Sequence, residues 1–268
     1  MKPSLLIVFT VWAMSILTAV PSHAEEWKEI KDKHFVVYYG SAMSSEEAGR
    51  LLRQAEKYYD LIARQIGYAR YSNFWTWEER VKIIIYDDQA AFMAKTGQPA
   101  WSKGYADRHP KLFESKMIVT YRQEQEFFNG LLPHEISHLI LHDFLGPQTS
   151  VPLWFDEGVA QLQEAEKRAV ADRLLQRLVL EKKQLPLPVL MELDIRREKN
   201  STKVTLFYVQ SLSVIDFLLT QYGSDAFARL CRQMRDGKSF AEALRLAYGH
   251  SFDSVQQLED KWINSFRN

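Results

Sequence analysis

The sequence is poor in cysteine and has no excess of charge of either sign. Cys231 is the one cysteine among 268 residues, which excludes a disulfide bond within the chain. Lys and Arg together number 34, as do Asp and Glu, so the formal net charge is zero. General nucleic-acid-binding proteins carry a basic surplus. We therefore expect no nucleic-acid partner.

Long apolar runs are also missing, except at the N-terminus. Leu5–Val20 carries no charge, follows Lys2, and precedes the small-x-small segment Ser22–Ala24. This arrangement predicts a secretory signal peptide over residues 1–24. The run is shorter than the about 20 residues of a membrane-spanning helix, and we expect no later stretch to be apolar enough to span a bilayer. Residues 25–268 are therefore predicted to be periplasmic or secreted, without stable membrane insertion; a retained N-terminal anchor is the alternative.

Apolar side chains are plentiful in the rest of the chain. Hydrophobic residues make up 46% of the sequence and aromatic residues 13%, which excludes a disordered acidic or basic tail. Runs of β-branched and aromatic residues predict strands at His34–Tyr39, Val81–Tyr86 and Lys116–Tyr121. After the first of these, a Ser-Ser-Glu-Glu start and recurring apolar residues predict a helix over about residues 46–66.

The second half of the chain has a different pattern. After residue 123 the apolar residues recur with helical spacing to the C-terminus. We therefore predict an α+β fold for residues 25–268, with an α+β part over about 25–145 and a helical part over about 150–268. Length alone permits one large domain or two small ones.

The sequence motif that predicts catalytic chemistry lies near the end of the α+β part, before the helical part. Residues 134–138 read His-Glu-Ile-Ser-His, which is HExxH. Side chains four positions apart on an α-helix share one face, about 6 Å apart along the axis. The imidazoles of His134 and His138 can then each offer a nitrogen to one Zn²⁺ ion, and Glu135 can take a proton from metal-bound water. The alternative is a buried helix whose two histidines are structural.

A third ligand tests this pattern, because a catalytic zinc ion keeps three protein ligands and one open position. His142 would lie about 12 Å along a straight helix from His134, so we interpret it as a surface residue or a hydrogen-bond partner behind the site. Glu157, 19 positions after His138, is the better candidate, because Gly and Pro residues between them turn the chain back. The alternative for Glu157 is a solvated carboxylate in the first turn of a second helix.

The HExxH pattern followed by a Glu in the context Trp-Phe-x-Glu-Gly-x-Ala, at Trp154–Ala160, resembles the gluzincin zinc metallopeptidases, and among them the peptidase MA-like group. The similarity is specific over about residues 128–165. It implies a thermolysin-like zincin catalytic core, with a small mixed β-sheet, an active-site helix and a helical C-terminal subdomain across a cleft. It also implies one Zn²⁺ per chain, bound by His134, His138 and Glu157, and a peptide or protein substrate.

The resemblance has further implications for substrate binding. It implies that the strand before the HExxH helix, Lys116–Tyr121, is the sheet edge that binds extended substrate. Gluzincin aminopeptidases carry a Gly-x-Met-Glu-Asn-type motif upstream, which Ser115–Val119 lacks, and this favours an endopeptidase. The thermolysin form Asn-Glu-x-x-x-Asp is absent downstream, where Gln161 stands four residues past Glu157. Gln161 is either a hydrogen-bond partner of a zinc-bound histidine or a solvated helix residue.

Hydrolysis also needs a hydrogen-bond donor for the oxyanion. Related enzymes use a Tyr or His from the C-terminal subdomain, which suggests Tyr208 or, second, His250. The other interpretation of Tyr208 is an aromatic residue packed in a helical core. Trp101, Tyr105 and Trp154 either line a specificity pocket or belong to the core.

Together these features predict an exported zinc metallopeptidase, most simply an endopeptidase. Zinc would lower the pKa of its bound water to roughly 7, and Glu135 would act as the general base. A Gly- and Pro-rich loop over about residues 96–110 is predicted to lie over the cleft. The main alternative is a non-catalytic envelope binding or assembly protein that retains the zincin fold. A metal hydrolase that acts on a non-peptide amide is a third hypothesis.

Overall fold

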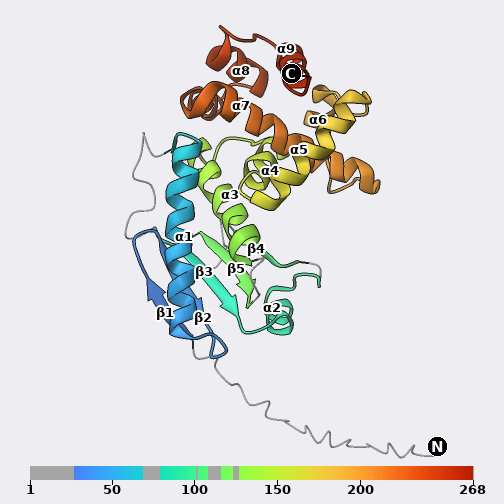
Figure 1. Cartoon of the computed structure of the whole chain (residues 1–268). Coiled ribbons are helices and arrows are strands. Elements are labelled where there is room, and N and C mark those ends of the chain that lie inside the picture. The colour runs from blue at the N-terminus through green and yellow to red at the C-terminus, as the bar shows by residue number, and fades with distance from the viewer. Residues whose placement is uncertain (1–26, 69–78, 101, 108–115, 123–126, 268) are drawn as a thin grey trace, which may run out of the picture.

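The structure, a computed structural model, describes residues 27–68, 79–100, 102–107, 116–122 and 127–267 (Figure 1). The predicted signal peptide lies outside these residues, as do Trp101 and the end of the predicted cleft loop, residues 108–110. Every strand of the described residues lies before residue 122. From residue 127 onward the described residues form helices and connecting turns. This confirms the predicted α+β class.

The sheet is small and mixed, with the strand order β1-β2-β3-β5-β4. The central strands β2, β3 and β5 are parallel, whereas the outer strands β1 and β4 are antiparallel to their neighbours. The bounds are β1 Lys28–Lys31, β2 Phe35–Tyr39, β3 Val81–Tyr86, β4 Gly104–Asp107 and β5 Met117–Tyr121. The three predicted strands are thus the central ones. The sequence pattern does not predict the outer two, because each has four residues and lacks a buried apolar run.

The strand at the HExxH side of the sheet is β4, not β5, so the edge position predicted for Lys116–Tyr121 is wrong. β4 pairs antiparallel with β5, with Gly104 opposite Thr120. A Cβ at Gly104 would lie 2.8 Å from Leu131 Cδ2 and 2.9 Å from the Val119 carbonyl oxygen. Glycine therefore lets β4 lie close to β5 and to the segment that leads into the HExxH helix, and β4 covers the side of β5 that the prediction left open.

Helices α1 (Ser45–Gln65) and α3 (Leu132–Leu145) lie side by side on one face of the sheet (Figure 1). α1 begins with a capping box: the Ser44 side chain accepts a hydrogen bond from the Glu47 backbone N–H, and the Glu47 carboxylate accepts one from the Ser44 backbone N–H. Its apolar residues, spaced three and four apart, are buried in the main core. This confirms the predicted first helix.

A smaller apolar cluster lies outside the main core, around α2 (Gln89–Thr96). The buried ring of Phe92 packs there with Met117 and Val119 of β5. Tyr105 of β4 joins this cluster, with its ring centroid 6.4 Å from that of Phe92. Of the two interpretations of Tyr105, a pocket residue or a packed aromatic residue, the contacts support the second.

The remaining helices gather at one end of the molecule, beyond α1 and α3 (Figure 1). They are α4 Leu153–Gln161, α5 Ala165–Leu180, α6 Leu187–Glu192, α7 Ser201–Arg235, α8 Phe240–Tyr248 and α9 Val255–Asn264. One cluster of buried apolar side chains runs from the sheet through α1 and α3 into these helices. Trp154 belongs to it, since only 1% of its surface is exposed and its ring packs edge-on against Phe155 and Phe240.

Helix α7 corrects one expectation. By length and composition it is apolar enough to cross a membrane, so the prediction that no stretch after the N-terminus reaches that level is wrong. α7 packs against α4, α5 and α8, and Leu212, Ile215 and Phe227 are among its buried residues. It breaks at Gly223, whose φ of 78° and ψ of 165° are not helical. This packing accounts for part of the apolar composition, since 44% of the most apolar stretch of α7 is buried.

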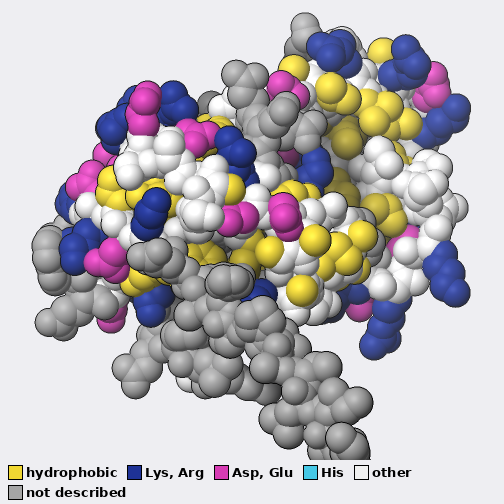
Figure 2. All heavy atoms as spheres, turned by 90° about the horizontal axis from the view of Figure 1, so that it is seen from below, with side chains coloured by type: hydrophobic (Ala, Val, Ile, Leu, Met, Phe, Trp, Pro, Cys, Tyr) yellow, Lys and Arg dark blue, Asp and Glu magenta, His cyan; other side chains and the backbone are white. Residues whose placement is uncertain are grey.

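Charged side chains of both signs are intermixed on the face of the molecule seen from below in Figure 2. Apolar side chains lie between them. On this face the acidic and basic side chains are therefore not separated into one acidic and one basic area.

Candidate metal centre

The HExxH residues lie in the first two turns of α3. A π-helical turn, η2 (Phe127–Leu131), leads into the helix. Pro133 occupies the first turn of α3, where a proline is tolerated because the first backbone N–H groups of a helix have no partner within it. His134 and His138 follow on one face, with their Nε2 atoms 3.1 Å apart. The helix thus brings the two imidazoles together, as the spacing predicts.

Helix α4 brings the third candidate ligand to these histidines. α3 ends at Gly146, which has a φ of 78°, and α4 begins after Pro152. Glu157 on α4 then lies with its Oε2 atom 3.9 Å from His134 Nε2. One ligand atom from each histidine and one from Glu157 all lie within 4.8 Å of one another. The chain reversal therefore assembles the three residues that the sequence points to.

Gly158 determines how closely α4 approaches α7. A Cβ at this position would lie 2.6 Å from the Ser211 carbonyl oxygen and 2.7 Å from Ile215 Cγ1. A larger residue would force the two helices apart, because well-packed interiors do not absorb such overlap without shifts of the backbone. The glycine directly after Glu157 thus allows α4 to pack against α7 while Glu157 reaches the α3 histidines.

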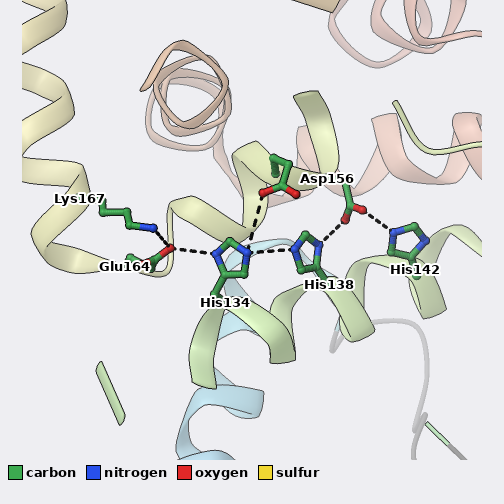
Figure 3. A network of polar contacts seen from close by, with 7 residues as sticks. His134, His138, His142, Asp156, Glu164 and Lys167 are labelled. Carbon is green, nitrogen blue, oxygen red and sulfur yellow. Dashed lines mark hydrogen bonds and ion pairs between the residues drawn. The ribbon is translucent and has the colours of Figure 1, made fainter. Parts of the chain in front are cut away.

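A carboxylate holds each candidate histidine ligand from behind (Figure 3). Asp156 Oδ1 lies 2.7 Å from His138 Nδ1, and Glu164 Oε1 lies 2.9 Å from His134 Nδ1. An ionised carboxylate only accepts hydrogen bonds, so each Nδ1 carries a hydrogen and Nε2 is the nitrogen of each imidazole that a metal ion could use. The two Nε2 atoms lie 3.1 Å apart with the Glu157 carboxylate beside them, an arrangement of ligand atoms that suits a cation.

The donor set fits zinc. Zn²⁺ binds imidazole nitrogen and carboxylate oxygen at about 2.0–2.2 Å in a tetrahedral arrangement, which places ligand atoms about 3.3 Å apart. Here the two Nε2 atoms are 3.1 Å apart, and His134 Nε2 and Glu157 Oε2 are 3.9 Å apart. Three protein ligands of these types are the number found at catalytic zinc sites, whereas structural sites use four.

The charges of the cluster shift the pKa values of its members. Burial opposes a charge on His138, but the Asp156 carboxylate and its hydrogen bond outweigh burial and raise the pKa of His138 to about 9. Burial also acts to raise the pKa of Asp156, yet His138 and His142 hold the pKa of that carboxyl well below its usual range. For Glu157 burial dominates and raises the pKa, because the charges of His138 and His134 offset it only in part.

Glu135 lies beside the three candidate ligands without being one of them. The residue is 8% exposed. Its negative charge acts on both sides of the cluster, where it raises the pKa of His138 and that of Glu157. Glu135 is therefore a buried carboxylate whose charge reaches the candidate ligands.

A cavity of about 670 Å³ opens onto the cluster between α5 and α7. His134, Glu157 and Tyr208 line it, so the structure brings Tyr208 to the predicted ligands. Burial, with a smaller contribution from the Glu157 charge, raises the pKa of Tyr208 to about 12, so its hydroxyl remains a donor at neutral pH. The apolar side chains of the cavity are Val170, Ala171, Val209 and Leu212.

A comparison with known families bears on this arrangement. The family model of the Peptidase MA superfamily matches residues 75–268, a span that contains the HExxH helix, the whole histidine–carboxylate cluster and the cavity. The chain belongs to the peptidase MA superfamily. No curated protein matches the chain. The family confirms the resemblance inferred from HExxH and the downstream Glu, and it supports a metallopeptidase that acts on peptide or protein substrates.

Two hydrogen-bond partners of the candidate ligands in this peptidase MA superfamily chain were not predicted. Gln161, which the sequence offers as a partner for a histidine, is buried and lines the cavity. The carboxylate on His134 is instead Glu164, at the turn after α4, and the one on His138 is Asp156. The only sequence signal is an acidic residue near the third ligand, and it does not show which histidine that residue contacts.

The other two histidines considered from the sequence lie apart from the ligand set. His142 is not in the candidate metal group, and its Nε2 lies 2.8 Å from Asp156 Oδ2, so it is a hydrogen-bond partner behind the site. His250 is exposed in the turn after α8 and does not line the cavity, which leaves Tyr208 as the better donor candidate. β4, which belongs to the predicted cleft loop, lies beside η2 and α3.

Proposed function

We propose that this member of the peptidase MA superfamily is a zinc-dependent endopeptidase with a thermolysin-like catalytic core. The observation that carries the proposal is the convergence of His134, His138 and Glu157 at a cavity, with Glu135 beside them. A zinc ion kept only for structure needs no general base, so the presence of Glu135 supports catalysis. The missing aminopeptidase motif supports internal cleavage.

Each residue of the site has one chemical task in this proposal. His134, His138 and Glu157 hold the zinc ion, which when bound supplies Lewis-acid activation of water and of the scissile carbonyl. Glu135 accepts a proton from the attacking water and passes it to the leaving amine. Tyr208, protonated at neutral pH, donates a hydrogen bond to the oxyanion.

The proposed substrate surfaces are β4 and the cavity. Among the described strands, β4 is the outer one next to η2 and α3, so an extended peptide that pairs with it would run close to the HExxH helix. The apolar wall of the cavity favours an apolar side chain next to the scissile bond. This replaces β5, the strand expected from the sequence, as the substrate-pairing strand.

We also propose that residues 1–24 direct export and that residues 25–268 act in the periplasm or outside the cell. The support is the sequence pattern alone: a basic start, an apolar run and a small-x-small site. The lack of a disulfide is compatible with any compartment.

The test of the function is digestion of a mixed peptide library by zinc-loaded residues 25–268, with a metal-chelated sample as control. We expect cleavage at internal bonds, and none in the chelated sample. Release of terminal residues alone would replace the endopeptidase by an exopeptidase. Zinc binding without any cleavage of peptides would favour the binding or assembly protein or the third hypothesis, a hydrolase of non-peptide amides.

Tyr208→Phe tests the oxyanion donor. We expect kcat to fall by about 10²-fold or more with little change in KM, because the lost hydrogen bond forms only in the transition state. Steady-state kinetics on a peptide identified from the library measures both constants. His250→Ala is the matched control, since the exposed His250 does not line the cavity. Equal kcat in Tyr208→Phe and the wild type would show that Tyr208 only packs.

A further inference from the structure

Asp156 bridges two histidines on the same face of α3. Its Oδ1 atom lies 2.7 Å from His138 Nδ1, and its Oδ2 atom lies 2.8 Å from His142 Nε2 (Figure 3). The two histidines are four residues apart, so one helical turn separates them. The Asp156 side chain is 16% exposed, and each imidazole is 15% exposed. Both oxygens of one largely buried carboxylate are therefore used by imidazoles.

We propose that His142 is a positioning residue of the metal centre: its Nε2–H holds Asp156 in the orientation in which Asp156 orients His138. The proposal rests on the zinc site described above. His142 is not a metal ligand, because the candidate ligand atoms belong to His134, His138 and Glu157. It acts on the ion only through Asp156.

His142 affects the orientation of Asp156 because the Asp156 carboxylate is largely buried. Without the His142 donor, Oδ2 would lose its hydrogen bond in a site with little access for water, and an unsatisfied buried carboxylate oxygen is unfavourable. Asp156 would then turn or shift to find another donor. Either movement weakens the bond from His138 Nδ1, which sets the tautomer and the direction of His138 Nε2.

Each candidate ligand has a carboxylate and an outer residue behind it, which together we call its arm. The arm behind His134 differs from the arm behind His138. Glu164 holds His134 Nδ1 at 2.9 Å and also accepts a hydrogen bond from Lys167 Nζ at 2.7 Å (Figure 3). Lys167 occupies the same place in its arm as His142 does in the other. Glu164, at 12% exposed, is as buried as Asp156, at 16%. The two arms differ in the outer residue, because Lys167 is 51% exposed and His142 is 15% exposed. His142 is therefore the outer residue that is itself buried, and solvent can replace it less readily than the exposed Lys167.

Zinc affinity of residues 25–268 tests the role without recourse to activity. The dissociation constant is measured by competition with a chromophoric chelator for the wild type, His142→Leu and His142→Gln. We expect His142→Leu to bind zinc about 10–100-fold more weakly, the range found when a partner behind a metal ligand is lost. Gln places an amide N–H near the position of Nε2 and should restore most of the affinity. His250→Leu, the same kind of change at an exposed histidine, should match the wild type.

Two further measurements separate positioning from folding. The absorption spectrum of the Co²⁺-substituted protein should change in His142→Leu and resemble the wild type in His142→Gln. Thermal unfolding without metal shows whether the variants fold alike. Wild-type affinity and spectrum in His142→Leu would overturn the role of His142 and leave the zinc site intact. Equal weakening in His142→Gln would overturn the hydrogen bond as its cause, and a wild type that binds no zinc would overturn the site and this role together.

Discussion

Glu157→Ala is expected to remove zinc from the chain. The substitution leaves two imidazole nitrogens 3.1 Å apart and takes away the one carboxylate of the candidate ligand group. The neighbouring carboxylates of Asp156 and Glu164 are already bonded to the Nδ1 atoms, so neither is free to replace it. The loss should therefore exceed the about 10–100-fold that removal of a partner behind a ligand causes.

Elemental mass spectrometry after dialysis measures this directly. We expect close to one zinc per chain in the wild type and a trace in Glu157→Ala. Glu166→Ala is the matched control, because Glu166 lines the same cavity, is exposed, and does not belong to the metal group. Zinc should also raise the thermal stability of the wild type, by about 2.7 kcal/mol at a free concentration of 100 times the dissociation constant, and leave the variant unchanged.

Two other outcomes of the zinc measurement would contradict the proposed ligand set. Full zinc content in Glu157→Ala would mean that another residue completes the site. No zinc in the wild type after reconstitution would make HExxH a remnant in this chain and favour the binding or assembly protein.

The parts of the fold that follow from the sequence are those whose signal is local. β3 is an uninterrupted run, Val-Lys-Ile-Ile-Ile-Tyr, and α1 has both a capping box and a regular apolar stripe. β1 and β4 have no such signal, because each has four residues without a buried apolar run and is recognisable as a strand only from its pairing with β2 or β5. The order of the strands also depends on pairing and not on local sequence. For this reason β5 could be predicted as a strand and still be wrongly expected at the edge.

The candidate site also contains both residues that the sequence predicts and residues that it does not. His134, Glu135 and His138 follow from helical spacing alone, and Glu157 follows from its distance along the chain and its motif context. Asp156 and Glu164 do not follow, because their contacts depend on how α4 folds back onto α3. Spacing did exclude His142 as a ligand, whereas its bond to Asp156 needed the three-dimensional arrangement.

Glu135→Gln is expected to abolish hydrolysis and to leave zinc in place. The amide has nearly the same shape as the carboxylate but cannot accept the proton of the attacking water. Loss of a general base costs about 10²–10⁴-fold in rate. Glu135 is outside the candidate ligand group, so the metal content should stay that of the wild type.

The measurement pairs kcat on a peptide from the library with zinc content of the same sample. Glu166→Gln is the matched control, since it makes the same chemical change at an exposed position by the cavity. The inactive, zinc-loaded Glu135→Gln chain should still bind the peptide, because the cavity and β4 are unaltered. A Glu135→Gln chain that keeps both its zinc and its wild-type kcat would show that another group moves the proton. Loss of zinc in this variant would instead place Glu135 among the groups that hold the ion.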